Sequence, residues 1–220
     1  MIDFTFDGDQ ALGYLALPGK AKGPGVLLLH PWWGLNPFMK DFATRLAGEG
    51  YVVLAPDLFH GPVATTIEDA QKLANSAVPE TIMREAAGAT QFLLSHEQTT
   101  GSAIGVVGFS FGAAWALWLA ENRPTDIAAT VIFYGSYPLD FVNTRSAFMG
   151  HFAESDPYEP MESVRATEQQ LIDAGATTTF HFYPGTGHWF FESDRPDAYH
   201  PSAAQLAWER TTSFLKHHLR

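Results

Sequence analysis

Three residues of this 220-residue chain have the types and the order needed for nucleophilic catalysis: Ser110, Asp156 and His188. A serine hydroxyl is a poor nucleophile at neutral pH, so it needs a histidine base within hydrogen-bond reach and a carboxylate that orients that base. Each of the three follows a segment that we expect to be a strand. Because the carboxyl ends of parallel strands share one edge of a sheet, the three side chains can meet there. The chemistry that this pattern predicts is acyl transfer.

The acid is less sharply defined than the serine and the histidine. Asp156 is the first choice, and Glu154, two residues earlier, is the second. Asp140 and Asp57 also lie in loops that could reach the same edge. The simplest structural interpretation of Asp156 and the proline after it is a turn or a helix cap, which fits the same spacing.

Ser110 lies in the pentapeptide Gly-Phe-Ser-Phe-Gly, a G-x-S-x-G pattern. The β-branched residues in 104–107 predict a buried strand before it, and the Ala-, Leu- and Trp-rich run 113–120 predicts a helix after it. A sharp turn between the two needs Gly108 and Gly112, because a Cβ at either position would clash. The pattern predicts the nucleophile elbow of an α/β-hydrolase fold, with an ordinary glycine-rich loop as the alternative.

Two backbone N–H groups are expected to hold the oxyanion. One is that of Phe111, directly after the nucleophile and at a helix N-terminus. The second should come from the loop after the strand 26–29, where Pro31 has no N–H, so Trp32 is the expected donor and Trp33 the alternative. Aromatic residues in these loops predict an apolar substrate pocket, lined by Trp33, Phe38, Trp189 and Phe190.

Strands and helices alternate along the chain, which predicts an α/β fold with a mostly parallel sheet and helices on both faces. The first two strands are expected to form an antiparallel hairpin around a turn at 7–9. No linker or repeat divides residues 1–220, so we expect a single domain. The predicted strands are 4–6, 12–17, 26–29, 51–55, 104–107, 128–134, 147–152 and 177–183, and the predicted helices are 37–46, 66–77, 80–95, 113–120, 160–174 and 203–219.

Composition narrows the class of protein. Hydrophobic residues make up 46% of the chain and charged residues 17%, which indicates a soluble globular protein. A net charge of -11 disfavours nucleic acids and anionic membranes as partners. The absence of cysteine excludes disulfides and a cysteine nucleophile, and fits a cytoplasmic protein without proving that location. The N-terminal residues show neither a signal peptide nor a membrane span.

No histidine pair has the helical spacing of a zinc site, so we expect no metal. We also expect no cofactor. The expected partner is a small-molecule substrate, and the expected state is a monomer or a weak homodimer.

With these residues assembled, the chain resembles the dienelactone hydrolase family. The likeness runs from about Gly25 to the C-terminus, and the stretches that carry it are 33–38, 50–58, 105–112 and 187–190. The resemblance implies a compact α/β-hydrolase domain without a lid, which hydrolyses esters or lactones. By position, Ser110, Asp156 and His188 fall on the family's triad.

The chain differs from the best-known members of that family at several positions, and the differences at Ser110 and Pro31 are consistent with each other. Those members have a cysteine at the position of Ser110 and a glutamate where Pro31 stands. A hydroxyl has a far higher pKa than a thiol, so it needs no carboxylate to control its resting state. They also bind a substrate carboxylate with arginines, whereas this chain has Glu192 at one such position and no arginine in 65–71, with Arg195 displaced.

We therefore expect a neutral ester, lactone or small acyl compound as the substrate. The leading hypothesis is a serine esterase or lactonase that works through an acyl-enzyme. A thioesterase or a small peptidase would use the same triad and differ only in the leaving group. A hydrolase fold that only binds a ligand is the hypothesis from another class.

Overall fold

The computed structural model describes residues 1–6, 8–19 and 21–219, and eight strands in that part of the chain form one sheet. Their order across the sheet is β1-β2-β4-β3-β5-β6-β7-β8. β1 and β2 are antiparallel to each other, β2 is antiparallel to β4, and every later pair of neighbours is parallel. The strands are β1 (Ile2–Phe6), β2 (Asp9–Ala16), β3 (Gly23–Leu29), β4 (Val52–Pro56), β5 (Thr99–Phe109), β6 (Ile127–Phe133), β7 (Ala147–Ala153) and β8 (Thr178–Tyr183).

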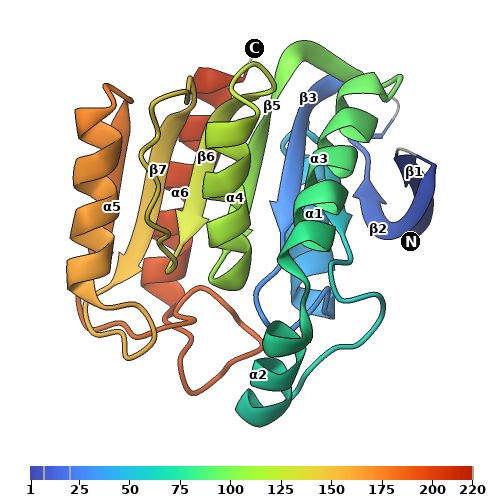
Figure 1. Cartoon of the computed structure of the whole chain (residues 1–220). Helices are drawn as coiled ribbons and strands as arrows, with labels where there is room; N and C mark the ends of the chain where they lie inside the picture. The colour runs from blue at the N-terminus through green and yellow to red at the C-terminus, as the bar shows by residue number, and fades with distance from the viewer. Residues whose placement is uncertain (7, 20, 220) are drawn as a thin grey trace.

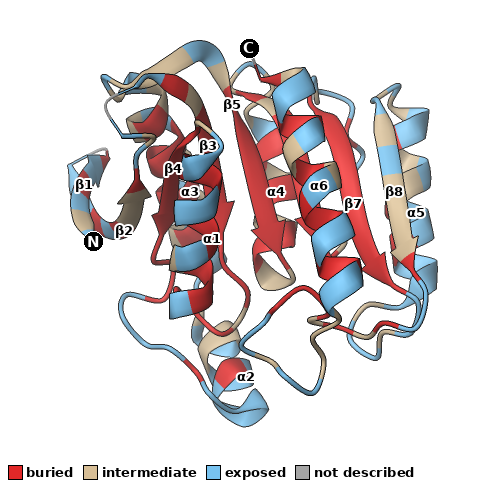
Figure 2. Cartoon of the chain, turned by 180° about the vertical axis from the view of Figure 1, so that it is seen from behind, coloured by how far each residue is buried: buried red, intermediate tan, exposed pale blue. Residues whose placement is uncertain are grey.

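Helices cover both faces of the sheet. α3, α4 and α5 lie on the face seen in Figure 1, and α1 and α6 lie on the opposite face, seen in Figure 2. α2 stands apart, at the edge where the parallel strands end (Figure 1). The helices are α1 (Pro37–Gly48), α2 (Ile67–Ser76), α3 (Pro79–Ser95), α4 (Phe111–Asn122), α5 (Met161–Asp173) and α6 (Pro201–His218).

Each face of the sheet has its own hydrophobic core. Phe42 of α1 and Trp208 of α6 belong to one cluster, while Ile82 of α3 and Leu117 of α4 belong to the other. Strands covered on both faces consist of nearly continuous apolar residues, as the run 26–29 of β3 does. This burial, shown in Figure 2, fixes the strand ends and therefore the loops that follow them.

The predicted α/β fold with a mostly parallel sheet is confirmed. Several boundaries differ by one to three residues, and the largest difference is at β5, which begins at Thr99, five residues before the apolar run that predicted it. Its polar first residues pair with Gly23 and Pro24 of β3, so backbone pairing extends the strand beyond its buried part. The predicted hairpin of β1 and β2 is present, although Asp7 of its turn lies outside the described residues.

No helix within the described ranges is both long enough and apolar enough to cross a lipid bilayer.

Candidate active site

Ser110 occupies a strained turn between β5 and α4. Its φ of 47° lies in the left-handed region, which residues with a side chain rarely adopt. A Cβ on Gly108 would lie 2.8 Å from the Cα of Ala113, and a Cβ on Gly112 would lie 2.7 Å from the carbonyl oxygen of His30. Both positions therefore require glycine, as the sequence predicted, because the turn is pressed against α4 and against the end of β3.

A third glycine, which lies against this turn, was not singled out from the sequence. A Cβ on Gly135, in the loop after β6, would lie 2.7 Å from the carbonyl oxygen of Ser110. Gly135 is far from Ser110 in sequence, and only the pairing of β5 with β6 brings them together. Local sequence therefore contains no signal for this contact.

The structure brings the three predicted catalytic side chains into one hydrogen-bonded chain. Ser110 Oγ lies 3.0 Å from His188 Nε2, and His188 Nδ1 lies 2.6 Å from Asp156 Oδ2. The side chains of His188 and Asp156 are only 4% and 5% exposed. Because little water reaches this pair, the carboxylate can fix the orientation of the imidazole and favour the tautomer whose Nε2 faces the serine.

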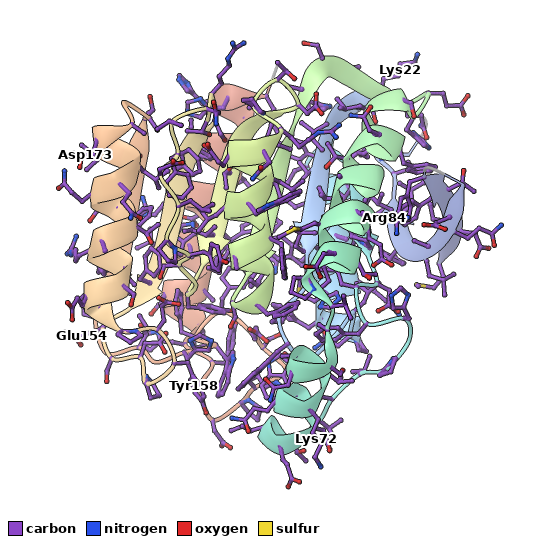
Figure 3. All side chains as sticks on the ribbon, viewed as in Figure 1. Lys22, Lys72, Arg84, Glu154, Tyr158 and Asp173 are labelled. Atoms are coloured by element: carbon purple, nitrogen blue, oxygen red, sulfur yellow. The ribbon has the colours of Figure 1, made fainter. Side chains whose placement is uncertain are left out.

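Backbone donors hold the acid in place. The N–H groups of Tyr158 and Glu159 donate to Asp156 Oδ1, at 2.9 and 3.0 Å. This leaves Oδ2 to face the histidine. Glu154, the alternative acid, accepts a bond from the N–H of Gly185 at 2.8 Å and is exposed, and Figure 3 shows it beneath α5 at the outer end of the sheet. The geometry thus pairs the base with Asp156.

The sequence predicts that two residues donate backbone N–H groups to the oxyanion. Phe111 is the first residue of α4, and Trp32 lies in the loop after β3. Neither backbone N–H donates a hydrogen bond to another residue in the described part of the chain. A developing oxyanion requires free N–H donors, and the helix dipole adds to the effect at Phe111.

His30 anchors the loop that carries Trp32. Nε2 of its buried ring accepts a hydrogen bond from the backbone N–H of Leu58, 3.1 Å away. Nδ1 donates a hydrogen bond to the carbonyl oxygen of Pro31 at 2.8 Å. Burial lowers the pKa of His30, which favours the neutral ring that this pattern needs. The loops after β3 and β4 are thereby tied together, so the backbone at Trp32 is held in position.

Aromatic side chains gather on one side of the triad. The rings of Trp189 and Tyr158 have their centroids 5.1 and 5.2 Å from that of His188, and the ring of Trp32 lies 5.5 Å from Tyr158. Trp33 is buried below them, with the Arg195 guanidinium 3.6 Å above its ring. Tyr158 was not predicted as a site residue, because nothing in the sequence marks the loop after Asp156 as aromatic lining.

The interpretation of Phe38 and Phe190 as pocket residues does not match their burial. Phe38 lies on the inner side of α1 and packs against Phe109 and Phe191. Phe190 has no exposed surface and packs between Tyr134 and Tyr183. Both belong to the core on the α1 and α6 face, so in this structure they have little or no surface to offer a ligand.

A buried carboxyl group, that of Glu192, lies next to Tyr134, which packs against the histidine. Tyr134, whose ring centroid is 4.8 Å from that of His188, donates its hydroxyl to Glu192 Oε1 at 2.6 Å. Glu192 Oε2 has no hydrogen-bond partner among the described residues. Burial raises the pKa of Glu192 to about 8, so the carboxyl is largely protonated at neutral pH.

Residues 12–219 match the protein-family model described as "Dienelactone hydrolase family". At 32% identity, the chain resembles "Protein usf" of Aquifex pyrophilus, with 100% of this chain and 98% of that protein covered. It is 30% identical to a protein of Aquifex aeolicus (strain VF5) named "Putative carboxymethylenebutenolidase", with 100% and 99% covered.

Among solved structures, the chain resembles a dienelactone hydrolase-like promiscuous phosphotriesterase from metagenomic libraries. The TM-score is 0.87 at 21% identity, and the match covers 100% of this chain and 97% of the other. This likeness shows a shared α/β-hydrolase fold.

Proposed function

The chain belongs to the dienelactone hydrolase family, and from that premise we propose that it is a serine hydrolase, which cleaves a carboxylic ester or a lactone through an acyl-enzyme on Ser110. The observation that carries the proposal is the continuous hydrogen-bond chain from Ser110 through His188 to Asp156. A base within reach of the hydroxyl and a carboxylate behind the base are the minimum for activating a serine.

In the first half of the reaction, Ser110 Oγ attacks the substrate carbonyl carbon while its proton passes to His188 Nε2. The N–H groups of Phe111 and Trp32 donate to the carbonyl oxygen as it becomes an oxyanion. Asp156 stabilises the imidazolium that forms. His188 then returns the proton to the leaving oxygen, the bond between the carbonyl carbon and that oxygen breaks, and an acyl-serine remains.

In the second half, water takes the place of the leaving alcohol. His188 accepts a proton from the water as its oxygen attacks the acyl carbon, and the same two N–H groups hold the second oxyanion. The proton then returns to Ser110 Oγ as the acid leaves. For a lactone the alcohol and the acid are parts of one molecule, so a single hydroxy acid is released.

Charge near the site supports a neutral substrate. Asp156 and Glu159 lie near the histidine, Glu192 is largely protonated, and the Arg195 guanidinium is stacked on Trp33. A carboxylate on the substrate would lie near the acidic side chains of Asp156 and Glu159. Of the predicted pocket residues, Trp189 combines partial exposure with a place beside the triad. Trp32, predicted as an oxyanion donor, is also partly exposed, and we include both side chains as substrate contacts.

The direct test is hydrolysis of p-nitrophenyl acetate by the wild-type chain and by Ser110→Ala. We expect turnover by the wild type and none above background from the variant, with an unchanged circular dichroism spectrum. Glu154→Gln is the matched control, since the Glu154 carboxylate bonds to the N–H of Gly185, whereas His188 bonds to Asp156. Turnover that survives Ser110→Ala would overturn the proposal. Parallel assays with a thioester and a peptide identify the leaving-group class.

A further inference from the structure

The side chains of Trp32, Tyr158 and Trp189 form an aromatic face beside the triad. They come from three loops, after β3, β7 and β8. Tyr158 is 41% exposed, and both tryptophans are partly exposed. Figure 3 shows Tyr158 at the edge of the sheet where the parallel strands end. A group of exposed aromatic rings beside a nucleophile is a contact surface that the reaction steps above do not use.

The spacing of the rings defines what they can bind. Their centroids lie 5.5 Å apart for Trp32 and Tyr158, 5.0 Å for Tyr158 and Trp189, and 6.1 Å for Trp32 and Trp189. At these distances the rings touch one another, so no cation fits between them as in an aromatic cage. They form a continuous surface, which offers an apolar ligand the largest contact if the ligand is itself flat.

The position of the aromatic face indicates which part of the substrate it contacts, namely the leaving group. The rings of Tyr158 and Trp189 lie within packing distance of the His188 ring, at 5.2 and 5.1 Å between centroids. His188 gives its proton to the leaving oxygen, so that oxygen must lie within hydrogen-bond distance of Nε2. A group attached to the leaving oxygen therefore lies against the aromatic face.

Acidic groups beside the face favour an uncharged ligand. Asp156 and Glu159 belong to the same loop as Tyr158, and Glu159 accepts hydrogen bonds from the backbone and side chain of Ser136. An anionic aryl group would meet these carboxyl groups at short range. On these grounds we propose that the preferred leaving group is an uncharged phenol, released from an aryl ester or an aryl lactone. This inference rests on the proposed function.

The test compares two acetates that differ in the leaving group. Phenyl acetate carries the flat ring, and hexafluoroisopropyl acetate carries an alkyl alcohol of similar acidity, so chemical reactivity is matched. We expect the wild type to have a kcat/KM for phenyl acetate at least several times higher than for the alkyl ester. Tyr158→Ala should reduce that preference by about three- to tenfold, the size of one lost aromatic contact, while Tyr158→Phe keeps it.

Tyr137→Ala is the matched control. Tyr137 is 45% exposed, close to the value for Tyr158, and forms no aromatic pair with any described residue, so its removal should leave the preference unchanged. Equal kcat/KM values for the two acetates in the wild type would overturn the inference and leave the serine mechanism standing. A preference that persists in Tyr158→Ala would also overturn it. If the wild type hydrolyses neither acetate, the proposed function itself fails.

Discussion

Two buried histidines of this protein differ in the groups that their ring nitrogens face. His188 and His151 are both almost inaccessible to water, and both ring nitrogens of each are hydrogen-bonded. His188 faces a carboxylate and the hydroxyl of Ser110. His151 lies within β7 and faces two neutral hydroxyls, with 2.7 Å from Nδ1 to Tyr183 Oη and 3.0 Å from Nε2 to Thr211 Oγ1.

The two histidines differ in whether a neighbouring group can stabilise the ring after it takes up a proton. His188 has Asp156 to stabilise an imidazolium. His151 has no carboxylate among its partners, and burial together with His181 and Arg210 lowers its pKa well below the usual value. Burial and full hydrogen bonding alone therefore describe a structural histidine. The carboxylate on one side and the strained serine on the other are what make a base.

Matched substitutions sharpen this contrast most. His188→Gln keeps a polar side chain but removes the base, so we expect kcat/KM for p-nitrophenyl acetate to fall by about 10⁴-fold or more. His151→Gln removes a ring of the same type and burial, and we expect kcat/KM per folded molecule to change by less than about threefold. A large loss of activity from His151→Gln with an intact fold would break the comparison.

Removal of the carboxylate should have the next largest effect. Asp156→Asn keeps the size of the side chain but no longer stabilises the imidazolium or the required tautomer, so we expect kcat to fall by about 10⁴-fold. Steady-state kinetics at several pH values measure this loss. Glu154→Gln serves as the control and should remain within about twofold of the wild type, because its carboxylate is exposed and bonds to Gly185. A reversed ranking of the two variants would make Glu154 the acid.

The residues of the hydrogen-bonded chain could be chosen from the sequence more readily than the residues around them, for a physical reason. The turn at Ser110 is a local feature, because Gly108 and Gly112 lie within two residues of it. The loops that carry Asp156 and His188 follow from the alternation of strands and helices. The burial of Phe38 and Phe190 depends instead on which side of a helix or a loop faces the core, and the aromatic pattern alone does not give that information.

The contacts that the sequence did not predict are all long-range. Gly135 meets Ser110 only because β6 pairs with β5. Tyr134 reaches Glu192 across 58 positions of the chain, and the sequence alone showed Glu192 only as a departure from a family pattern. No local propensity encodes such pairs, because they depend on which loops the sheet brings to one edge.

His151 should matter for the stability of the fold, although it should matter little for activity. His151→Gln leaves at least one of two buried hydroxyls unpaired, so we expect a loss of about 1–3 kcal/mol in the free energy of unfolding. Because the pKa of His151 is lowered in the folded state, the unfolded chain takes up a proton first, and wild-type stability falls as the pH drops below 6.5. Urea titrations at two pH values should show a smaller acid loss in the variant.

Glu192 should produce the reverse dependence on pH. Its pKa is raised from 4.5 to about 8, so between these values the folded chain holds a proton that the unfolded chain has lost. Its contribution to stability therefore falls as the pH rises, by at most about 1.4 kcal/mol per pH unit. Glu192→Gln keeps an acceptor for Tyr134 and cannot ionise, so the decline should be shallower in urea titrations from pH 5 to 8. Identical slopes would contradict the raised pKa.

Covalent labelling tests the central claim most directly, because a fluorophosphonate reacts with a serine only when a base activates it. The wild-type chain should gain the mass of one phosphonyl group, located by peptide mapping on Ser110, and both Ser110→Ala and His188→Gln should remain unlabelled. An unlabelled wild type, an adduct on another residue, or full labelling of His188→Gln would contradict the account.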